Sequence, residues 1–162
     1  QSAPGSQHVT ITFAVKGAFT ASMARLKTGD EVWLKLPYGD LFTQPHRKEK
    51  TVFIAGGTGI TPFLSLFGDS AFAEYTSPKV YLGFRSEFYN IYHKELGTFP
   101  PGSLRIVYED REGRIDGRTV VAENGTDASY FISGPPSMIR SLKTCLQQEG
   151  VSSENILTDD WE

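Results

Sequence analysis

The stretch from Thr51 to Pro62 limits the possible folds of this chain more than any other part of the sequence. It starts with a short apolar run, Val52 to Ala55, which is typical of a strand buried inside a parallel sheet. Glycines follow at once, and after Pro62 the apolar residues recur with helical spacing. A strand, a glycine turn and a helix in this order present backbone N–H groups and the positive end of a helix to an anion. The stretch therefore predicts a phosphate-binding turn; the alternative is a turn that only connects strand and helix.

The glycine turn is similar to the fingerprint of dinucleotide-binding proteins, with a proline at the position of the third glycine. Two glycines suffice for a tight turn and for the close approach of a pyrophosphate. Proline suits the first helical turn, because its missing N–H leaves no helical hydrogen bond unmade there. No Lys-Ser or Lys-Thr pair follows, which excludes a nucleoside-triphosphate P-loop. The candidate cofactor-binding residues of the turn are Gly56, Gly57, Thr58, Gly59, Thr61 and Pro62.

From residue 51 onward the sequence alternates between strand and helix patterns. Strands are predicted at 52–55, 79–84, 104–108, 130–133 and 155–158, and helices at 62–75, near 88–96, around 119–123 and at 137–149, with a loop at 109–117. This alternation predicts an α/β fold with a five-stranded parallel, Rossmann-like sheet and helices on both faces. Ligands of such sheets bind outside the carboxyl ends of the strands. Directly after the strands come the glycine turn, Arg85-Ser86, Glu109-Asp110, Ser133-Gly134-Pro135-Pro136 and Trp161, so we expect these residues at one site.

Residues 1–44 have a different pattern and are predicted to form a smaller unit. Strands are predicted at 8–15 and 31–36, and a short helix over 21–27 would be capped by Thr20. The polar, basic stretch 43–50 has the composition of a linker between two units.

Composition excludes several classes of protein. The 162 residues are enough for one full hydrophobic core and a small second unit. A net charge of −3 gives no electrostatic reason to expect nucleic acid or an anionic membrane surface as a partner. No apolar run is long enough to span a bilayer, and the single cysteine, Cys145, excludes an internal disulfide or a four-cysteine iron–sulfur site. The histidines have no metal-ligand spacing, so no metal site is predicted.

Several short motifs stand in a specific order along nearly the whole chain. They are Gly17-Ala18-Phe19-Thr20, Gly29-Asp30, Pro37-Tyr38-Gly39-Asp40-Leu41-Phe42, the glycine turn, Gly83-Phe84-Arg85, Ser133-Gly134-Pro135-Pro136-Ser137-Met138 and the ending Asp160-Trp161. The ordered set resembles the ferredoxin–NADP reductase superfamily, in which a flavin-binding barrel precedes a nicotinamide-binding domain. Within that superfamily the chain is most similar to bacterial reductase domains related to ferric-reductase and oxygenase-reductase modules.

The resemblance implies that residues 1–44 are the C-terminal part of an antiparallel flavin-binding barrel and that residues 45–162 are an NAD(P)H-binding domain. Relatives carry an Arg-x-Tyr/Phe-Ser/Thr strand that grips the flavin just before a segment like Gln1-Ser2-Ala3-Pro4, and the sequence does not contain that strand. We therefore expect the chain to be part of a longer reductase that binds FAD. We also expect this part alone to be inactive as an enzyme.

The resemblance also implies an activity, that of an NAD(P)H-dependent flavin oxidoreductase. A hydride would pass from NAD(P)H to FAD, and electrons would pass onward to an unidentified acceptor: haem, an iron–sulfur protein, a ferric complex or a quinone. The implied location is cytoplasmic, either free or as the cytoplasmic part of a membrane-attached reductase. The alternative is a non-catalytic module that binds or senses a dinucleotide.

Ser133, Asp160 and Trp161 are the catalytic candidates that the resemblance implies. Ser133 and Gly134 would lie beside the nicotinamide, together with Pro135 and Met138 of the same motif. Many relatives have cysteine where Ser133 stands. Trp161 would stack on the flavin ring, and Asp160 beside it would assist proton or hydride transfer. The alternatives are that Ser133 only begins a turn, that Trp161 is an apolar plug and that Asp160 is solvated.

Gly17, Phe19 and Thr20 match the loop that binds the flavin pyrophosphate in relatives. A hydroxyl and backbone N–H groups at a helix start suit that role, and a plain helix cap is the alternative for Thr20.

The preference between NADH and NADPH depends on the residues that follow positions 84 and 108. Glu109 and Asp110 favour the free ribose diol of NADH over the 2′-phosphate of NADPH. Arg85 and Arg111 are the cations that would favour NADPH, although Arg85 could equally contact the pyrophosphate or be solvated. NADH is therefore the predicted dinucleotide.

Overall fold

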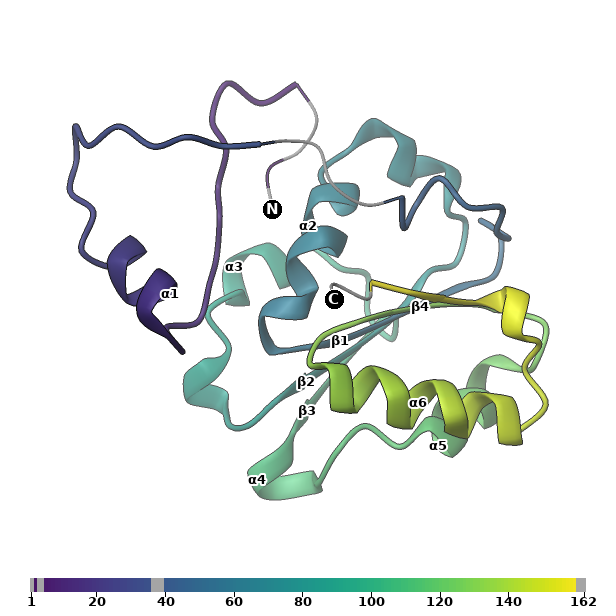
Figure 1. Ribbon diagram of the computed structural model, residues 1–162. Coiled ribbons are helices and arrows are strands. Elements are labelled where there is room, and N and C mark those ends of the chain that lie inside the picture. The colour runs from purple at the N-terminus through teal and green to yellow at the C-terminus, as the bar shows by residue number, and fades with distance from the viewer. Residues whose placement is uncertain (1, 3–4, 36–39, 160–162) are drawn as a thin grey trace.

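A five-stranded parallel sheet forms the centre of the molecule, in the order β3-β2-β1-β4-β5 (Figure 1). The computed structural model describes residues 2, 5–35 and 40–159. The strands are β1 Thr51–Gly56, β2 Lys79–Phe84, β3 Leu104–Tyr108, β4 Ser129–Ser133 and β5 Ile156–Thr158. The predicted α/β class and its parallel sheet are thus confirmed, and strand limits differ from the predicted ones by one residue at most.

The central strands are buried on both faces, as their continuous apolar runs predict. On one face Phe53 of β1 stacks on Phe131 of β4, with ring centroids 5.4 Å apart, and both pack against Phe63. On the opposite face Ile54 and its neighbours pack against Leu146. Each of these buried side chains contributes about 2 kcal/mol through removal of apolar surface from water.

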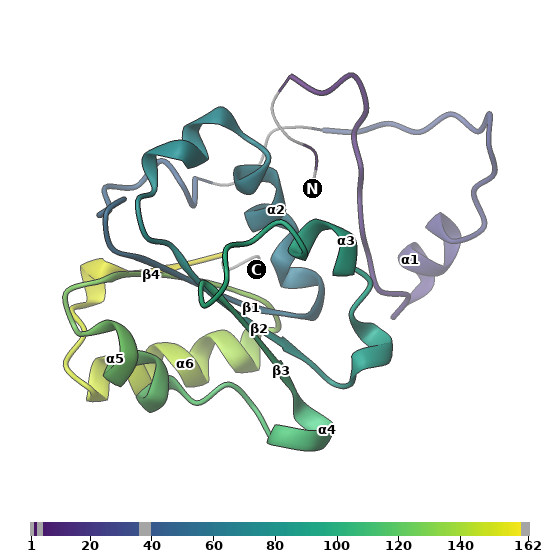
Figure 2. The ribbon, with the colours of Figure 1, turned by 180° about the vertical axis from the view of Figure 1, so that it is seen from behind.

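Helices cover both faces of the sheet (Figures 1 and 2). One layer contains the 3₁₀ turn η1 Gly57–Ile60, α2 Thr61–Phe67, η2 Ser70–Glu74, η3 Glu87–Tyr89 and α3 His93–Leu96. The other contains α5 Gly117–Asn124 and α6 Pro136–Gln148, while α4 Glu109–Glu112 lies past the end of β3 and η4 Ser153–Asn155 precedes β5.

Three predictions about the helices were wrong in detail. The helix predicted at 62–75 is two pieces, because α2 ends at Gly68 and Asp69 starts η2 by accepting a hydrogen bond from the N–H of Ala71 at 2.9 Å. The helix predicted near 88–96 is also two pieces, η3 and α3. The predicted loop after β3 begins with α4, whose acidic first turn suits the positive end of a helix.

The part of residues 1–44 that the structure describes contains one helix, α1 Ala18–Met23, and no paired strand. Residues 8–15 and 31–35, predicted as strands, are extended and carry exposed apolar side chains such as Val15 and Trp33. A strand requires the backbone groups of a neighbour, and these segments form no sheet ladder within the described residues. In both views they lie with α1 on the far side of α2 and α3 from α5 and α6 (Figures 1 and 2).

The order of the strands reverses beside β1. The chain moves outward from β1 through β2 to β3, and then returns to place β4 and β5 on the other side of β1. Ala55 of β1 lies in register with Ser133 of β4, so the two strands end side by side. Open α/β sheets bind their ligands at such a reversal, outside the carboxyl ends of the strands.

Candidate functional site

A pocket of about 300 Å³ opens between the ends of β1 and β4. Its lining residues are Lys16, Thr58, Gly59, Thr61, Pro62, Ser133, Gly134, Pro135 and Asp159. All of them except Lys16 and Asp159 belong to the two motifs that the sequence placed after the first and fourth strands of the sheet. The structure therefore brings the glycine turn and the Ser133 motif together in one pocket.

The glycine turn packs directly on the end of β4. A Cβ atom on Gly59 would overlap the carbonyl oxygen of Ser133 and would lie 2.6 Å from the backbone nitrogen of Gly134. Gly57 has a φ of +55°, the left-handed region that side chains disfavour, with open space around it. The turn is thus held in place by contact with the Ser133 motif, in addition to any contact with a ligand.

Gly56 and Met138 lie close together outside the pocket lining. A Cβ atom on Gly56 would overlap the sulfur of Met138 and would come within 3.1 Å of the ring of Pro135. Met138 follows in the first turn of α6, so this contact joins the end of β1 to the start of that helix. Both residues support the pocket from behind in this structure; their predicted direct contact with a cofactor stays a prediction.

Ser133 and Asp159 form a hydrogen-bonded pair at the pocket. The Ser133 hydroxyl donates to Oδ2 of Asp159 at 3.0 Å, and the Ser133 side chain is buried. The backbone N–H of Asp159 also donates to the carbonyl oxygen of Ile132, which extends the ladder between β4 and β5 by one bond. The sequence reasoning missed Asp159, although it follows the last strand directly and the strand-end rule could have found it. The predicted residues Asp160 and Trp161 lie outside the described residues.

Lys16 supplies the one cation among the described residues that line the pocket, and sequence reasoning missed it. It immediately precedes Gly17, Phe19 and Thr20, the predicted flavin loop. The Thr20 hydroxyl oxygen accepts from the backbone N–H groups of Lys16 and Gly17 at 2.9 and 3.1 Å, so Thr20 fixes this loop from inside α1 rather than from the predicted cap position. The side chain of Phe19 is exposed and, like Gly17 and Thr20, does not line the pocket.

A second group of predicted residues gathers where β2 and β3 end. The backbone N–H of Asp110 donates to the carbonyl oxygen of Arg85 at 3.1 Å, which joins the two strand-end loops. Glu109 forms an ion pair with Arg114, with Oε1 2.8 Å from Nε. Ser86 begins the turn η3, and neither it nor the other residues of this group line the pocket.

Arg111 lies in the same group and is already paired. Its Nη2 atom is 2.8 Å from Oε2 of Glu87, and its guanidinium lies over the ring of Tyr108, 5.4 Å from the centroid. The hydrogen bond to Glu87 and the charge of that carboxylate raise the pKa of Arg111. The guanidinium therefore remains charged and has a defined place at the edge of the site.

Metal binding and membrane crossing were both searched for among the described residues. No group of three His, Cys, Asp or Glu side chains there could hold a metal ion. No helix in the described part of the chain combines the length and apolarity that crossing a bilayer requires. His46 differs from the expectation of a solvated histidine, because its ring stands edge-on to Phe131 and its Nε2 lies 2.7 Å from the Tyr75 hydroxyl.

Comparison with known sequences finds relatives of one kind. No family model matches the chain. A component of the Na⁺-translocating NADH-quinone reductase of Neisseria gonorrhoeae is 30% identical over 168 residues, which cover 91% of this chain and 41% of that protein. The corresponding component of the Haemophilus influenzae reductase is 28% identical over the same shares. The chain thus spans about two fifths of the length of these relatives.

Comparison with solved structures identifies the fold. A ferredoxin–NADP⁺ reductase from Neisseria gonorrhoeae with bound FAD and NADP matches with a TM-score of 0.68 and 16% identity over 88% of this chain and 69% of its own. The flavohemoglobin of Malassezia yamatoensis matches with a TM-score of 0.65 and 24% identity, over 92% and 42%. The CS-b5R domains of human Ncb5or match with a TM-score of 0.64 and 21% identity, over 93% and 48%.

Proposed function

Since the chain has the fold of ferredoxin–NADP reductase-like proteins, we propose that it is the nicotinamide-dinucleotide-binding part of a flavoprotein oxidoreductase. In the whole protein a hydride passes from NAD(P)H to FAD, and electrons pass onward to a redox partner. The observation that carries the proposal is the pocket at the reversal of strand order, where the glycine turn meets the Ser133 motif. Residues 45–162 form the dinucleotide unit, and residues 1–44 belong to the flavin-binding barrel.

The pocket fits the pyrophosphate and nicotinamide of a dinucleotide. Thr58, Gly59 and Thr61 give one wall of small or hydroxyl-bearing residues that lets a phosphate approach the backbone, and Lys16 provides the opposite charge. Ser133 and Asp159 form a polar pair on the β4 side, where the nicotinamide binds. The Asp159 carboxylate holds the Ser133 hydroxyl in one direction, which positions it toward the ring.

The cofactors supply the redox chemistry, and this chain orients them. Gly17, Phe19 and Thr20 contact FAD in the full-length protein; Trp161 and Asp160 act beside the flavin ring. Arg85, Ser86, Glu109 and Asp110 surround the adenosine half of the dinucleotide. We propose NADH as that dinucleotide, because carboxylates at the end of β3 favour a ribose diol.

The electron acceptor is a quinone, haem, an iron–sulfur protein or a ferric complex. The relatives from the Na⁺-translocating reductase are named for NADH and quinone, and the flavohemoglobin holds haem, so a quinone and haem have the most support. The work of the chain is cytoplasmic under this proposal, because that is where NADH is formed.

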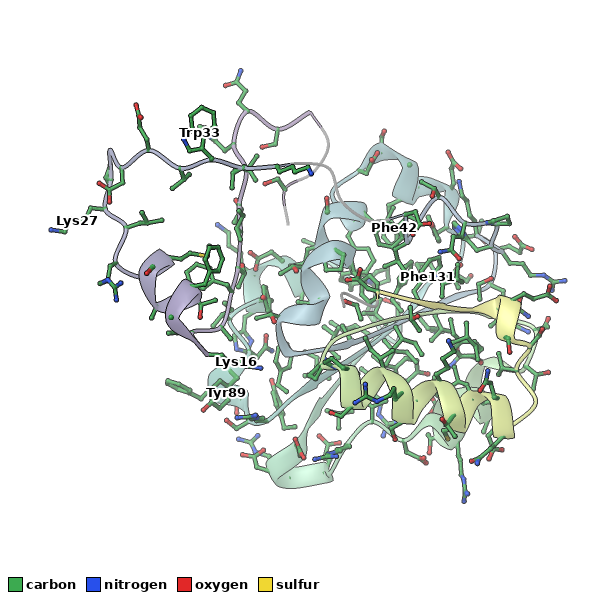
Figure 3. The ribbon with its side chains drawn as sticks, viewed as in Figure 1. Lys16, Lys27, Trp33, Phe42, Tyr89 and Phe131 are labelled. Carbon is green, nitrogen blue, oxygen red and sulfur yellow. The ribbon has the colours of Figure 1, made fainter. Side chains whose placement is uncertain are left out.

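Calorimetric titration of this chain with NADH and NADPH, at fixed ionic strength, tests the proposal. NADH is expected to bind, and Lys16→Met to weaken it about tenfold, the value of one charge-assisted hydrogen bond to a phosphate. Lys27→Met is the matched control, because Lys27 points away from the sheet in the same unit (Figure 3). Binding of neither dinucleotide in the presence of FAD, or equal losses in both variants, would contradict it. Dinucleotide binding without flavin reduction in the full-length protein would favour the sensing module instead.

A further inference from the structure

The ends of β2 and β3 carry an arrangement of charges that bears on which dinucleotide the proposed site accepts. The inference rests on the proposed function and concerns the adenosine end of the same site. Two arginines follow the end of β3, and both are neutralised: Arg111 by Glu87 and Arg114 by Glu109, each with a separation of 2.8 Å. A 2′-phosphate therefore meets no uncommitted guanidinium on α4.

The position of Arg111 is fixed by more than its ion pair. Its guanidinium lies over the Tyr108 ring, and the Tyr108 hydroxyl accepts a hydrogen bond from Nδ2 of Asn90 at 3.2 Å. Asn90 is buried, so it anchors that ring. On the other side, the turn η3 that carries Glu87 is closed by a bond from the Tyr89 N–H to the Ser86 carbonyl oxygen at 3.1 Å. Glu87 and Arg111 thus face each other from two constrained loops.

The sheet order places this ion pair on the adenosine side of the site. A dinucleotide with its pyrophosphate at the glycine turn and its nicotinamide beside Ser133 extends its other half away from β4. The strands in that direction are β2 and then β3, and Glu87 and Arg111 follow their ends. The 2′ position of the adenosine ribose is the group that distinguishes the two dinucleotides at this end.

We propose that Glu87 sets the preference for NADH over NADPH by occupying Arg111, the guanidinium that would otherwise pair with the 2′-phosphate. Arginine binds phosphate through two parallel N–H donors, and a carboxylate already engaged with those donors competes directly. Glu87 also repels the phosphate, and its oxygens accept hydrogen bonds from a free ribose diol. One carboxylate therefore acts against NADPH and in favour of NADH.

The ion pair can be removed without unfolding the protein. The side chains of Glu87 and Arg111 are 56% and 59% exposed, and exposed pairs contribute little to stability. Substitution of Glu87 should free Arg111 while its contact with the Tyr108 ring holds it in place. The consequence for ligand choice can then be measured on a folded protein.

The test compares the affinities of AMP and adenosine 2′,5′-bisphosphate, and of NADH and NADPH, for the wild-type chain and for Glu87→Gln. Glu87→Gln should raise the affinity for the 2′-phosphorylated member of each pair about tenfold relative to the other, because it frees a charge-assisted pair. Arg111→Met in the Glu87→Gln background should remove that gain. Circular dichroism and thermal unfolding of each variant confirm that the fold is unchanged.

Glu112→Gln is the matched control, because it removes the same charge from α4 and forms no ion pair among the described residues. It should change the ratio by less than about threefold, the size of a screened charge effect at this distance. Equal changes in Glu87→Gln and Glu112→Gln, an unchanged ratio in Glu87→Gln, or a gain that survives Arg111→Met would each overturn the inference. Failure of the wild type to bind any of the four ligands would overturn the proposed function instead.

Discussion

At the residue scale, two glycines of the same turn are required for different physical reasons. Gly57 adopts a φ of +55° with open space around it, so only its backbone conformation demands glycine. Gly59 has an ordinary φ, and its missing side chain is what lets the turn rest on Ser133 and Gly134. A sequence motif shows both as the same letter, and the tertiary contact separates them.

Substitution by alanine distinguishes these two roles. Gly57→Ala should cost about 1 kcal/mol of unfolding free energy through backbone strain, and Gly57→Asn less, because asparagine tolerates this region. Gly59→Ala should cost about 1–3 kcal/mol through overpacking, and should also lower dinucleotide affinity by moving the two motifs apart. Urea unfolding measures both costs. A smaller loss in Gly59→Ala than in Gly57→Ala would show that the turn does not depend on the contact with β4.

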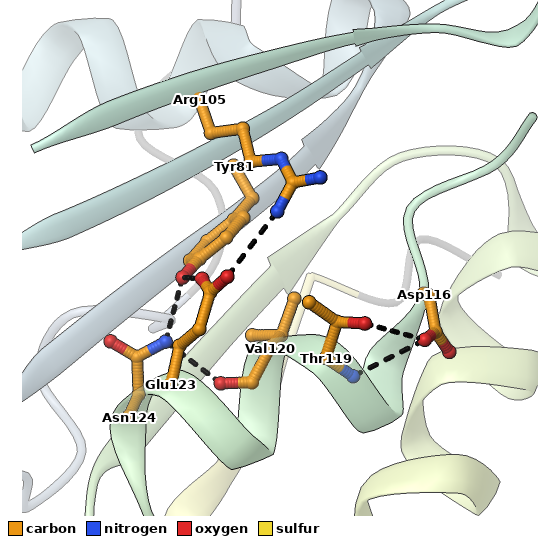
Figure 4. Close-up of polar contacts among 7 residues, drawn as sticks. All are labelled: Tyr81, Arg105, Asp116, Thr119, Val120, Glu123 and Asn124. Atoms are coloured by element: carbon orange, nitrogen blue, oxygen red, sulfur yellow. Dashed lines mark hydrogen bonds and ion pairs between the residues drawn. The ribbon is translucent and has the colours of Figure 1, made fainter. Parts of the chain in front are cut away.

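At the element scale, the loop and helix after α4 depend on Asp116. Its carboxylate accepts hydrogen bonds from the N–H groups of Arg118 and Thr119 at 3.2 and 3.3 Å and from the Thr119 hydroxyl at 2.7 Å (Figure 4). These contacts lower the pKa of Asp116, the Thr119 hydroxyl most of all. Further along α5, Glu123 and Asn124 both contact the Tyr81 hydroxyl, so a correctly started helix is joined to β2.

Removal of the Asp116 cap should therefore destabilise the protein. Asp116→Ala is expected to lower the unfolding free energy by about 1 kcal/mol, the usual value of an N-cap. Asp116→Asn keeps an acceptor and should lose less. Because the folded-state pKa is lowered, the contribution is present above the ordinary value of 3.8 and decreases as the pH falls below it. Urea unfolding at pH 7 and pH 3 should show a smaller difference between wild type and Asp116→Ala at pH 3; an equal difference would assign the effect to helix propensity.

At the scale of the whole molecule, three buried tyrosines make the fold sensitive to alkaline pH. Burial raises the pKa of Tyr75, Tyr81 and Tyr130 from 10.0 to about 12. Tyr81 also donates to the carboxylate of Glu123 at 2.5 Å, which adds to the increase. These tyrosines come from both sides of the sheet, so their ionisation requires the whole core to open.

Stability should accordingly be constant in this respect below pH 10 and decrease between pH 10 and 12. A group with a raised folded-state pKa loses its contribution as the pH passes from the unfolded to the folded value, which amounts to about 1 kcal/mol for each tyrosine at pH 11. Urea unfolding at pH 9, 10 and 11 should show this slope. Tyr81→Phe removes one of the three groups and should reduce the slope by about a third; an unchanged slope would exclude Tyr81 as a contributor.

The sequence by itself determined the parallel sheet and the location of the pocket. Apolar runs, glycines and helical spacing are local properties, and they fixed β1 to β5 and the residues that follow each strand. The meeting of the glycine turn with Ser133 followed from the rule that parallel strands end at one edge. The division into residues 1–44 and 45–162, and the role of each site residue, stay predictions.

Only the tertiary structure decided which groups face each other. Asp159 holds Ser133, Lys16 reaches the pocket from the N-terminal unit, and Arg111 pairs with Glu87 rather than remaining available for a phosphate. Local pattern cannot specify such partners, because they come from segments far apart in the sequence whose distance depends on register and loop packing. The same reason explains the extended segments of the N-terminal unit: alternation specifies a strand-like backbone, but a strand forms only where another strand lies beside it.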